Sequence, residues 1–306
     1  MRLEKFERLI KKFTTFKTWE NIEELWLNHI PAIDPIGSPP EISVVDFVNF
    51  RNVVNSIQWN ESLEFTRVDI QGIRSMVLHE GIFWIHKALH VLGIAEKRAL
   101  GRQVTWSLSD GYHAALFSAQ AILNFWGIAT PAVNQKTILI DVWTDPDPLT
   151  SKAKKRGETP IPIVQLAKLD EQIGHVHVWL LLQRLLRLNN ISIWNQVTVD
   201  LLIDVKHSDF AAQRNAIHYT SRQWLYPDLF GPSAKDNFSF ETNDLERCLT
   251  ADNLQSELSL ALGITLAKMA ITMFRSVAEK SVQLQGELAL LDKHLSSSQH
   301  PYMVST

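Results

Sequence analysis

Cysteine is nearly absent from this chain of 306 residues, which contains only Cys248. A single cysteine cannot form an intramolecular disulfide, and its isolation excludes zinc modules that are built on cysteine pairs. Such a composition is typical of proteins in a reducing compartment, so we expect a cytoplasmic location.

The sequence also lacks an excess of basic residues, because 30 lysines and arginines stand against 33 aspartates and glutamates. Without a global positive field, binding of nucleic acid would need a local basic patch. Long apolar runs are missing as well: "VHVWLLL" at 176–182 stops at Gln183 and Arg184, short of the roughly 20 residues that span a bilayer. The N-terminal "MRLEKFERLIKKF" mixes charges with apolar residues, so we expect neither an export signal nor contact with a membrane.

Several catalytic motifs are absent too. The sequence has no G-x-x-x-x-G-K-[ST] loop, no G-x-G-x-x-G after a strand and no G-x-S-x-G elbow, which removes the usual supports for nucleotide hydrolysis and acyl transfer. Histidines with metal-ligand spacing occur twice, as His79, His86 and His90 and as His175 and His177. Neither group comes with a matching carboxylate motif, so we expect packing roles there, no metal and no cofactor.

What the sequence does contain is helical periodicity. Hydrophobic residues make up 45% and charged residues 21%, the balance of an ordinary globular protein. The apolar spacing predicts helices at about 71–99, 107–128 (with a Ser/Asp cap and a stop at Gly127), 163–188, 191–205, 208–222 and 251–292, and a strand at 137–143. Residues 44–70 fit either a strand or a helix. The predicted fold is mainly α, a helical bundle with an N-terminal helical extension and at most a small β element.

The first 70 residues form the predicted extension. Residues 3–27 have the pattern of an amphipathic helix with a basic outer face, which we expect to dock on its own domain in preference to a membrane or a nucleic acid. The proline-rich stretch 29–42 is a candidate boundary. We therefore divide the chain into an N-terminal helix and linker region that could dock a partner (1–70), a helical bundle (71–292) and a flexible tail (293–306).

The segment "QRNAIHY", residues 213–219, holds the candidate catalytic residues Arg214 and His218. On a helix, residues four apart share a face with Cβ atoms about 5–6 Å apart, and Arg222 would extend this stripe by another turn. A neutral histidine can take or give a proton near neutral pH, while arginine can hold a phosphate and stabilise developing charge. The alternative is a helix with solvated arginines, in which His218 and Tyr219 form hydrogen bonds into the core.

Three segments in this order resemble the HEPN superfamily, the higher eukaryotes and prokaryotes nucleotide-binding domain. "SLSDGYHAALFSAQAILNFWGI" resembles its first core helix, "QRNAIHY" its signature helix, and "LALGITLAKMAITMF" the helix packed behind it, so that the match covers roughly residues 105–285. The resemblance implies a HEPN-like bundle and a metal-independent ribonuclease of bacterial antiviral or toxin-antitoxin systems. Such enzymes act as dimers with the arginine and histidine of both subunits across a cleft. Arg214 and His218 would be catalytic, with Asn215 orienting one of them.

The spacing in this motif departs from the family pattern. Only three residues separate Arg214 from His218, where the active pattern has four to six. The alternative function is therefore a non-catalytic HEPN-like subunit that binds RNA, or a protein partner such as an antitoxin, within a larger complex.

A dense basic segment, "SKAKKRG" at 151–157, lies in a polar, proline-bearing loop. We expect it either to be solvated or to contact a nucleic-acid backbone, which gives affinity that is blind to sequence and sensitive to salt. The candidate binding residues are therefore Arg222, Lys152, Lys154, Lys155 and Arg156.

Overall fold

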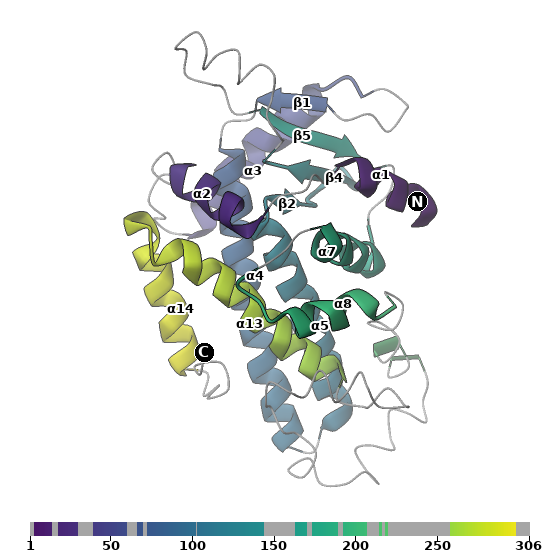
Figure 1. Ribbon diagram of the computed structural model, residues 1–306, viewed down its shortest axis with the longest axis vertical. Helices are drawn as coiled ribbons and strands as arrows, with labels where there is room; N and C mark the ends of the chain where they lie inside the picture. Colours follow the sequence, from purple (N-terminus) through teal and green to yellow (C-terminus); the bar gives the residue numbers. More distant parts are fainter. Residues whose placement is uncertain are drawn as a thin grey trace.

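A computed structural model shows a mainly α-helical protein with a small antiparallel sheet, as the sequence predicts (Figure 1). Three long helices run side by side through its centre: α4 (Ile73–Leu100), α5 (Val104–Phe125) and α13 (Leu258–Ala278). The structure describes residues 3–13, 18–29, 39–59, 66–69, 72–101, 103–143, 163–169, 173–188, 192–206, 214–215, 218–219 and 258–297.

Helices α4 and α5 confirm the predictions for 71–99 and 107–128. The predicted Ser/Asp cap of the second helix is wrong, however, because α5 already begins at Val104 and has Gln103 at its N-cap. Ser107 and Ser109 are therefore buried within the first turns of the helix. The predicted stop is confirmed, since Gly127 has a positive φ of 84°, and an added Cβ there would lie 2.3 Å from Trp143 Cδ1.

The predicted helix at 251–292 is interrupted. Helix α13 ends at Ala278, a 3₁₀ turn covers Val282–Leu284, and α14 (Gln285–Ser297) follows. The side-chain nitrogen of Gln285 donates to the carbonyl oxygens of Ala278 (2.9 Å) and Ser281 (3.2 Å). Each of these carbonyls also accepts a backbone N–H, from Ser281 and Leu284 respectively, so the Gln285 side chain adds a second bond to each at the break between the helices. Helix α14 also includes residues 293–297, the beginning of the segment expected as a tail.

Five short strands form the antiparallel sheet, with the order β1-β5-β4-β2 and with β3 paired to β4. Strand β4 (Lys136–Asp141) is the strand predicted at 137–143, and its partners are β1 (Thr66–Asp69), β2 (Ile128–Ala129), β3 (Ala132–Val133) and β5 (Ile163–Lys168). Asn134 and Gln135 join β3 to β4 with φ angles of 50° and 63°. Positive φ at both positions is typical of a tight hairpin turn.

The start of the predicted helix 163–188 is wrong, because residues 163–168 form β5. Ile140 of β4 pairs with Leu166, and Val164 pairs with Val68 of β1. Tertiary pairing thus overrides the helical pattern in this stretch. The helix itself, α7, spans His175–Leu188, and α8 (Gln196–Asp204) lies within the segment predicted at 191–205.

The N-terminal region contributes α1 (Leu3–Phe13), α2 (Trp19–His29) and α3 (Pro39–Ser56), and all three pack on the bundle or the sheet region. The predicted single helix at 3–27 is therefore two helices. The apolar residues Phe6, Leu9 and Ile10 of α1 are buried in the common core. Docking on its own domain is thus what the structure shows for this helix.

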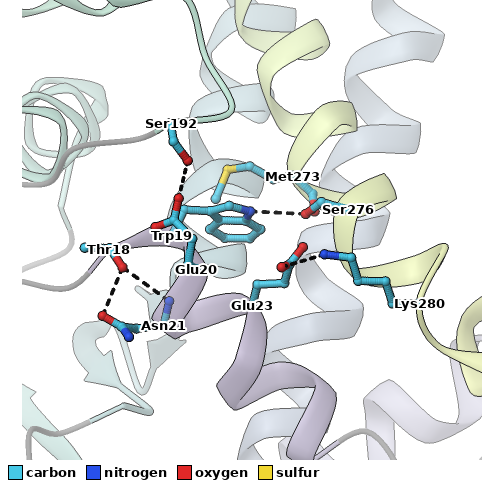
Figure 2. Close-up of polar contacts among 9 residues, drawn as sticks. All are labelled: Thr18, Trp19, Glu20, Asn21, Glu23, Ser192, Met273, Ser276 and Lys280. Carbon is cyan, nitrogen blue, oxygen red and sulfur yellow. Dashed lines mark hydrogen bonds and ion pairs between the residues drawn. The ribbon is translucent and has the colours of Figure 1, made fainter.

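Helix α2 is fastened to α13 by polar contacts (Figure 2). The Trp19 indole donates to Ser276 Oγ at 3.1 Å, and Lys280 pairs with Glu23 at 2.8 Å. Deeper in the core, the Trp26 indole donates to the carbonyl of Phe125 at 2.7 Å. Two buried tryptophans thus join α2 to α13 and to the end of α5.

Helix α13 is, within the described part of the chain, the one helix long and apolar enough to cross a membrane. Its most apolar 18-residue window is 72% buried in the protein, as in the core helix of a bundle. Its apolar residues pack on α5 and α4.

Two glycines allow α5 and α13 to approach very closely. A Cβ added to Gly263 would lie 2.7 Å from the carbonyl oxygen of Gly111, and one added to Gly111 would lie 2.8 Å from Leu260 Cα. Both obstacles are backbone atoms, which cannot turn aside. The two helices therefore pack backbone to backbone at this crossing.

We predict that Gly263→Ala destabilises the protein by about 1–3 kcal/mol, the usual cost of overpacking a core. Gly286→Ala is the matched control, because nothing lies within 4 Å of that position in α14. Alanine there should be neutral or stabilise by up to about 1 kcal/mol through helix propensity. Urea unfolding measures the free energy of unfolding of both variants, provided that its dependence on urea concentration stays the same as in the wild type. Equal effects of the two substitutions would contradict the close crossing.

Candidate active site

A cavity of about 340 Å³ lies beside the first turns of α5. Three of its lining side chains come from successive turns of that helix, Trp106, Ser109 and His113, and His218 closes it from the segment predicted as a signature helix. Arg98, Gln103 and Asp110 complete the lining. The cavity thus contains two imidazoles from distant parts of the sequence.

The motif residues are placed next to α5. His218 Nε2 lies 2.8 Å from Ser109 Oγ, and the Arg214 guanidinium donates to Asn215 Oδ1 at 3.1 Å. The Arg214 guanidinium also lies 6.0 Å from the centre of the Tyr219 ring. All four described residues of this segment, 214–215 and 218–219, are helical; the rest of the predicted helix 208–222 lies outside the described residues.

A second histidine, His113, is held in a defined tautomer. Its Nδ1 lies 2.8 Å from the backbone carbonyl oxygen of Ser109. Because a carbonyl oxygen only accepts, Nδ1 carries the proton. Nε2 then faces the cavity, where it is an acceptor in the neutral ring and a donor in the imidazolium. Ser109 therefore contacts both imidazoles, His113 through its carbonyl and His218 through its hydroxyl.

A third histidine, His175 at the start of α7, is bound through a buried tyrosine. The Trp179 indole donates to the Tyr112 hydroxyl at 3.3 Å, and that hydroxyl lies 3.1 Å from His175 Nδ1. Since the phenol oxygen accepts from Trp179, its own hydrogen is free to point at His175 Nδ1. The His175 and His113 rings meet edge to face at 6.4 Å.

The local field favours neutral imidazoles. Burial lowers the pKa of His218, and the charges of Arg214 and His113 lower it further. The pKa of His175 is lowered by the same three causes: burial has the largest effect, and the charges of Arg214 and His113 follow. Burial raises the pKa of Tyr112, which keeps that hydroxyl protonated. One permanent cation is thus surrounded by two rings that are held neutral and by a neutral phenol.

The outer rim of the cavity carries an ion pair and an exposed aromatic ring. Arg98 pairs with Asp110 at 2.7 Å. Trp106 is 39% exposed, and its ring meets the His218 ring edge to face at 5.9 Å. Trp19, Trp26 and Trp179 are buried in the core, whereas Trp106 presents its surface at this site.

Several predicted site residues cannot be placed. Arg222 and the basic residues Lys152, Lys154, Lys155 and Arg156 lie outside the described residues. In the parts of the chain that the structure covers, no three His, Cys, Asp or Glu side chains are arranged to hold a metal ion.

The histidine groups with metal-ligand spacing point to different partners. His79 is buried, which lowers its pKa to about 4, while His86 stacks on His294 of α14. His177 Nδ1 accepts from the Gly174 amide, and its ring packs against Phe6. His175 instead turns toward Tyr112. His79 and His86 therefore have separate surroundings, as do His175 and His177, whereas His90 acts on the pKa of His294, the residue on which His86 stacks.

Sequence reasoning missed His113, Tyr112 and Ser109 as site residues. All three lie in the segment "SLSDGYH", whose serine and aspartate residues predict a helix cap. Their signal is the spacing, since Ser109 and His113 are four residues apart and so share a helix face, as Arg214 and His218 do.

Comparison with known proteins finds no matching family model, no matching characterised protein and no matching solved structure.

We predict that Arg214→Gln raises the pKa of both His218 and His175, because the substitution removes a positive charge that opposes protonation of the two rings. Histidine ring resonances followed by NMR over pH measure both values. Lys280→Gln is the control, because it removes a cation that pairs with Glu23 on α2. Unchanged titration of both histidines in Arg214→Gln would place Arg214 away from them.

Proposed function

We propose that this chain is a metal-independent endoribonuclease of the HEPN type, with Arg214 and His218 in its active site. The observation that supports this best is the convergence of His218, His113 and the Arg214 segment on one side of α5, where the first two line a single cavity. Proton-transfer groups and a fixed cation are what cleavage of a phosphodiester needs.

In this mechanism a neutral imidazole takes the proton of a ribose 2′-hydroxyl. The 2′-oxygen then bonds to phosphorus, the bond from phosphorus to the 5′-oxygen breaks, and a protonated imidazole gives its proton to that oxygen. The products are a 2′,3′-cyclic phosphate and a 5′-hydroxyl. Arg214 stabilises the charge on the phosphate oxygens, and Asn215 orients its guanidinium.

Two imidazoles in one chain supply both proton-transfer roles. His218, whose pKa is lowered by burial and by Arg214, suits the base. His113, with its Nδ1 proton donated to the Ser109 carbonyl, presents Nε2 for the acid. The resemblance alone implies an active site shared between two subunits. With His218 as the base and His113 as the acid, a single subunit supplies both groups.

We expect His218→Ala and His113→Ala each to reduce cleavage of a generic single-stranded RNA by about 10²–10⁴-fold, the usual contribution of a proton-transfer group. Arg214→Ala should reduce it by about 10²–10³-fold. Lys280→Gln is the control and should cleave like the wild type, as should wild type in a chelator. If all three active-site variants keep full activity, or if chelation abolishes it, the assignment is wrong. RNA binding without cleavage by the wild type would favour the non-catalytic alternative.

Mixing the variants tests whether the site lies within one chain. An equimolar mixture of His113→Ala and Arg214→Ala should stay inactive, because every chain lacks one group of its own site. Recovery of cleavage in the mixture would show that each site takes residues from two chains.

A further inference from the structure

A second cavity, of about 250 Å³, lies toward the other end of α5. It is enclosed by α4, α5 and the segment of β2 and β3, with Glu80 and Trp84 from α4 and Gln120 from α5 among its lining residues. Gln120 follows Ser109 by eleven residues, which is about 16 Å along a helix. This cavity is therefore separate from the candidate active site.

One wall of the cavity is a fixed aromatic surface. The Trp84 ring stacks on Phe117 with centroids 5.3 Å apart and planes 25° apart. The Lys87 ammonium lies 4.8 Å from the Trp84 centroid and 4.3 Å from that of Phe117. Lys87 is held over these rings and does not line the cavity, so Glu80 is the one charged residue among the described residues that line it.

Two acceptors in the cavity lack donors. Gln120 Oε1 is buried and receives no hydrogen bond, and no described residue donates to the Glu80 carboxyl group. Asn124, one turn beyond Gln120, differs because partners for its amide lie nearby: with the amide turned over, it donates to the Ile128 carbonyl at 3.0 Å and accepts from the Gly81 amide at 3.2 Å. Burial raises the pKa of the Glu80 carboxyl group, and the positive charge of Lys87 offsets part of this rise without donating a hydrogen bond to it.

Unpaired acceptors of this kind carry a free-energy cost. A buried oxygen without a donor loses its hydration, and a carboxylate loses more than an amide. The ligand that removes this cost supplies several N–H donors and a positive charge. The flat Trp84 surface adds a preference for a planar group, on which a cation also gains from the ring quadrupole.

We propose that this cavity binds a small amidinium or guanidinium compound. Its N–H groups donate to Glu80 and Gln120, and its planar body lies against Trp84. A planar fork of donors can reach two oxygens at once, which a single ammonium point charge does less well. The proposal is independent of the nuclease chemistry, because it uses no residue of the first cavity.

The experiment is a calorimetric titration of the full chain with benzamidine, a planar aromatic amidinium. We expect saturable binding to the wild type and affinity about 10- to 100-fold weaker in Glu80→Gln, which keeps the shape but loses the charge. Glu279→Gln is the matched control, because Glu279 is an exposed carboxylate in the turn after α13. It should bind like the wild type.

Two further measurements keep the outcome clear if Glu80→Gln folds poorly. Benzamide, a neutral molecule of nearly the same shape, should bind the wild type at least about 10-fold more weakly than benzamidine. Gln120→Met, which removes an acceptor at similar size, should weaken benzamidine binding roughly 2- to 10-fold. Absence of benzamidine binding to the wild type, equal binding of benzamide, or unchanged affinity in both cavity variants would each overturn the proposal.

Discussion

The backbone contact between Gly111 and Gly263 is the constraint that places the rest of the molecule. It sets α13 directly against α5, while α4 packs along another side of the same helix. Because α13 and α4 cover two faces of α5, the polar side chains that line the cavities project from the part of α5 that these helices leave uncovered. Ser109 and His113 fall beside the first cavity, and Gln120 falls beside the second. Both cavities therefore lie on parts of α5 that α13 does not cover, and none of the described residues lining them comes from α13.

The polar groups around Arg214 form a site with one permanent positive charge, beside two histidines whose pKa values are lowered. Its imidazoles are held neutral partly by the guanidinium itself, whose field opposes their protonation. An anion bound in the same place would act in the opposite direction, because negative charge favours the protonated ring. A bound phosphate would thus help to generate the imidazolium that donates to the leaving oxygen. The substrate would adjust the protonation of the residues that act on it, with no movement of the backbone.

Much of the fold follows from periodicity, but the small sheet and the site depend on long-range contacts. Helices α4 and α5, the strand β4 and the stop at Gly127 are visible in the sequence because their patterns are local. Strand β5 is not, because "IVQLAK" reads as the start of a helix until β1 and β4 flank it. In the site, Arg214 and His218 could be predicted from their spacing. The contact between His113 and His175 could not be predicted, since only the packing of α5 and α7 brings these two rings together.

The bond between Trp19 and Ser276 joins residues that are 257 positions apart, and this separation has a consequence for the order of folding. At a synthesis rate of about 5–20 residues per second, α2 leaves the ribosome roughly 13–50 seconds before its partner on α13 exists. During that interval Trp19 lacks its hydrogen-bond partner on α13, whereas the partner of Trp26, the carbonyl of Phe125, follows it by only 99 residues. The nascent chain would therefore expose the aromatic surface of Trp19, a suitable target for a chaperone, until α13 has been synthesised and covers it.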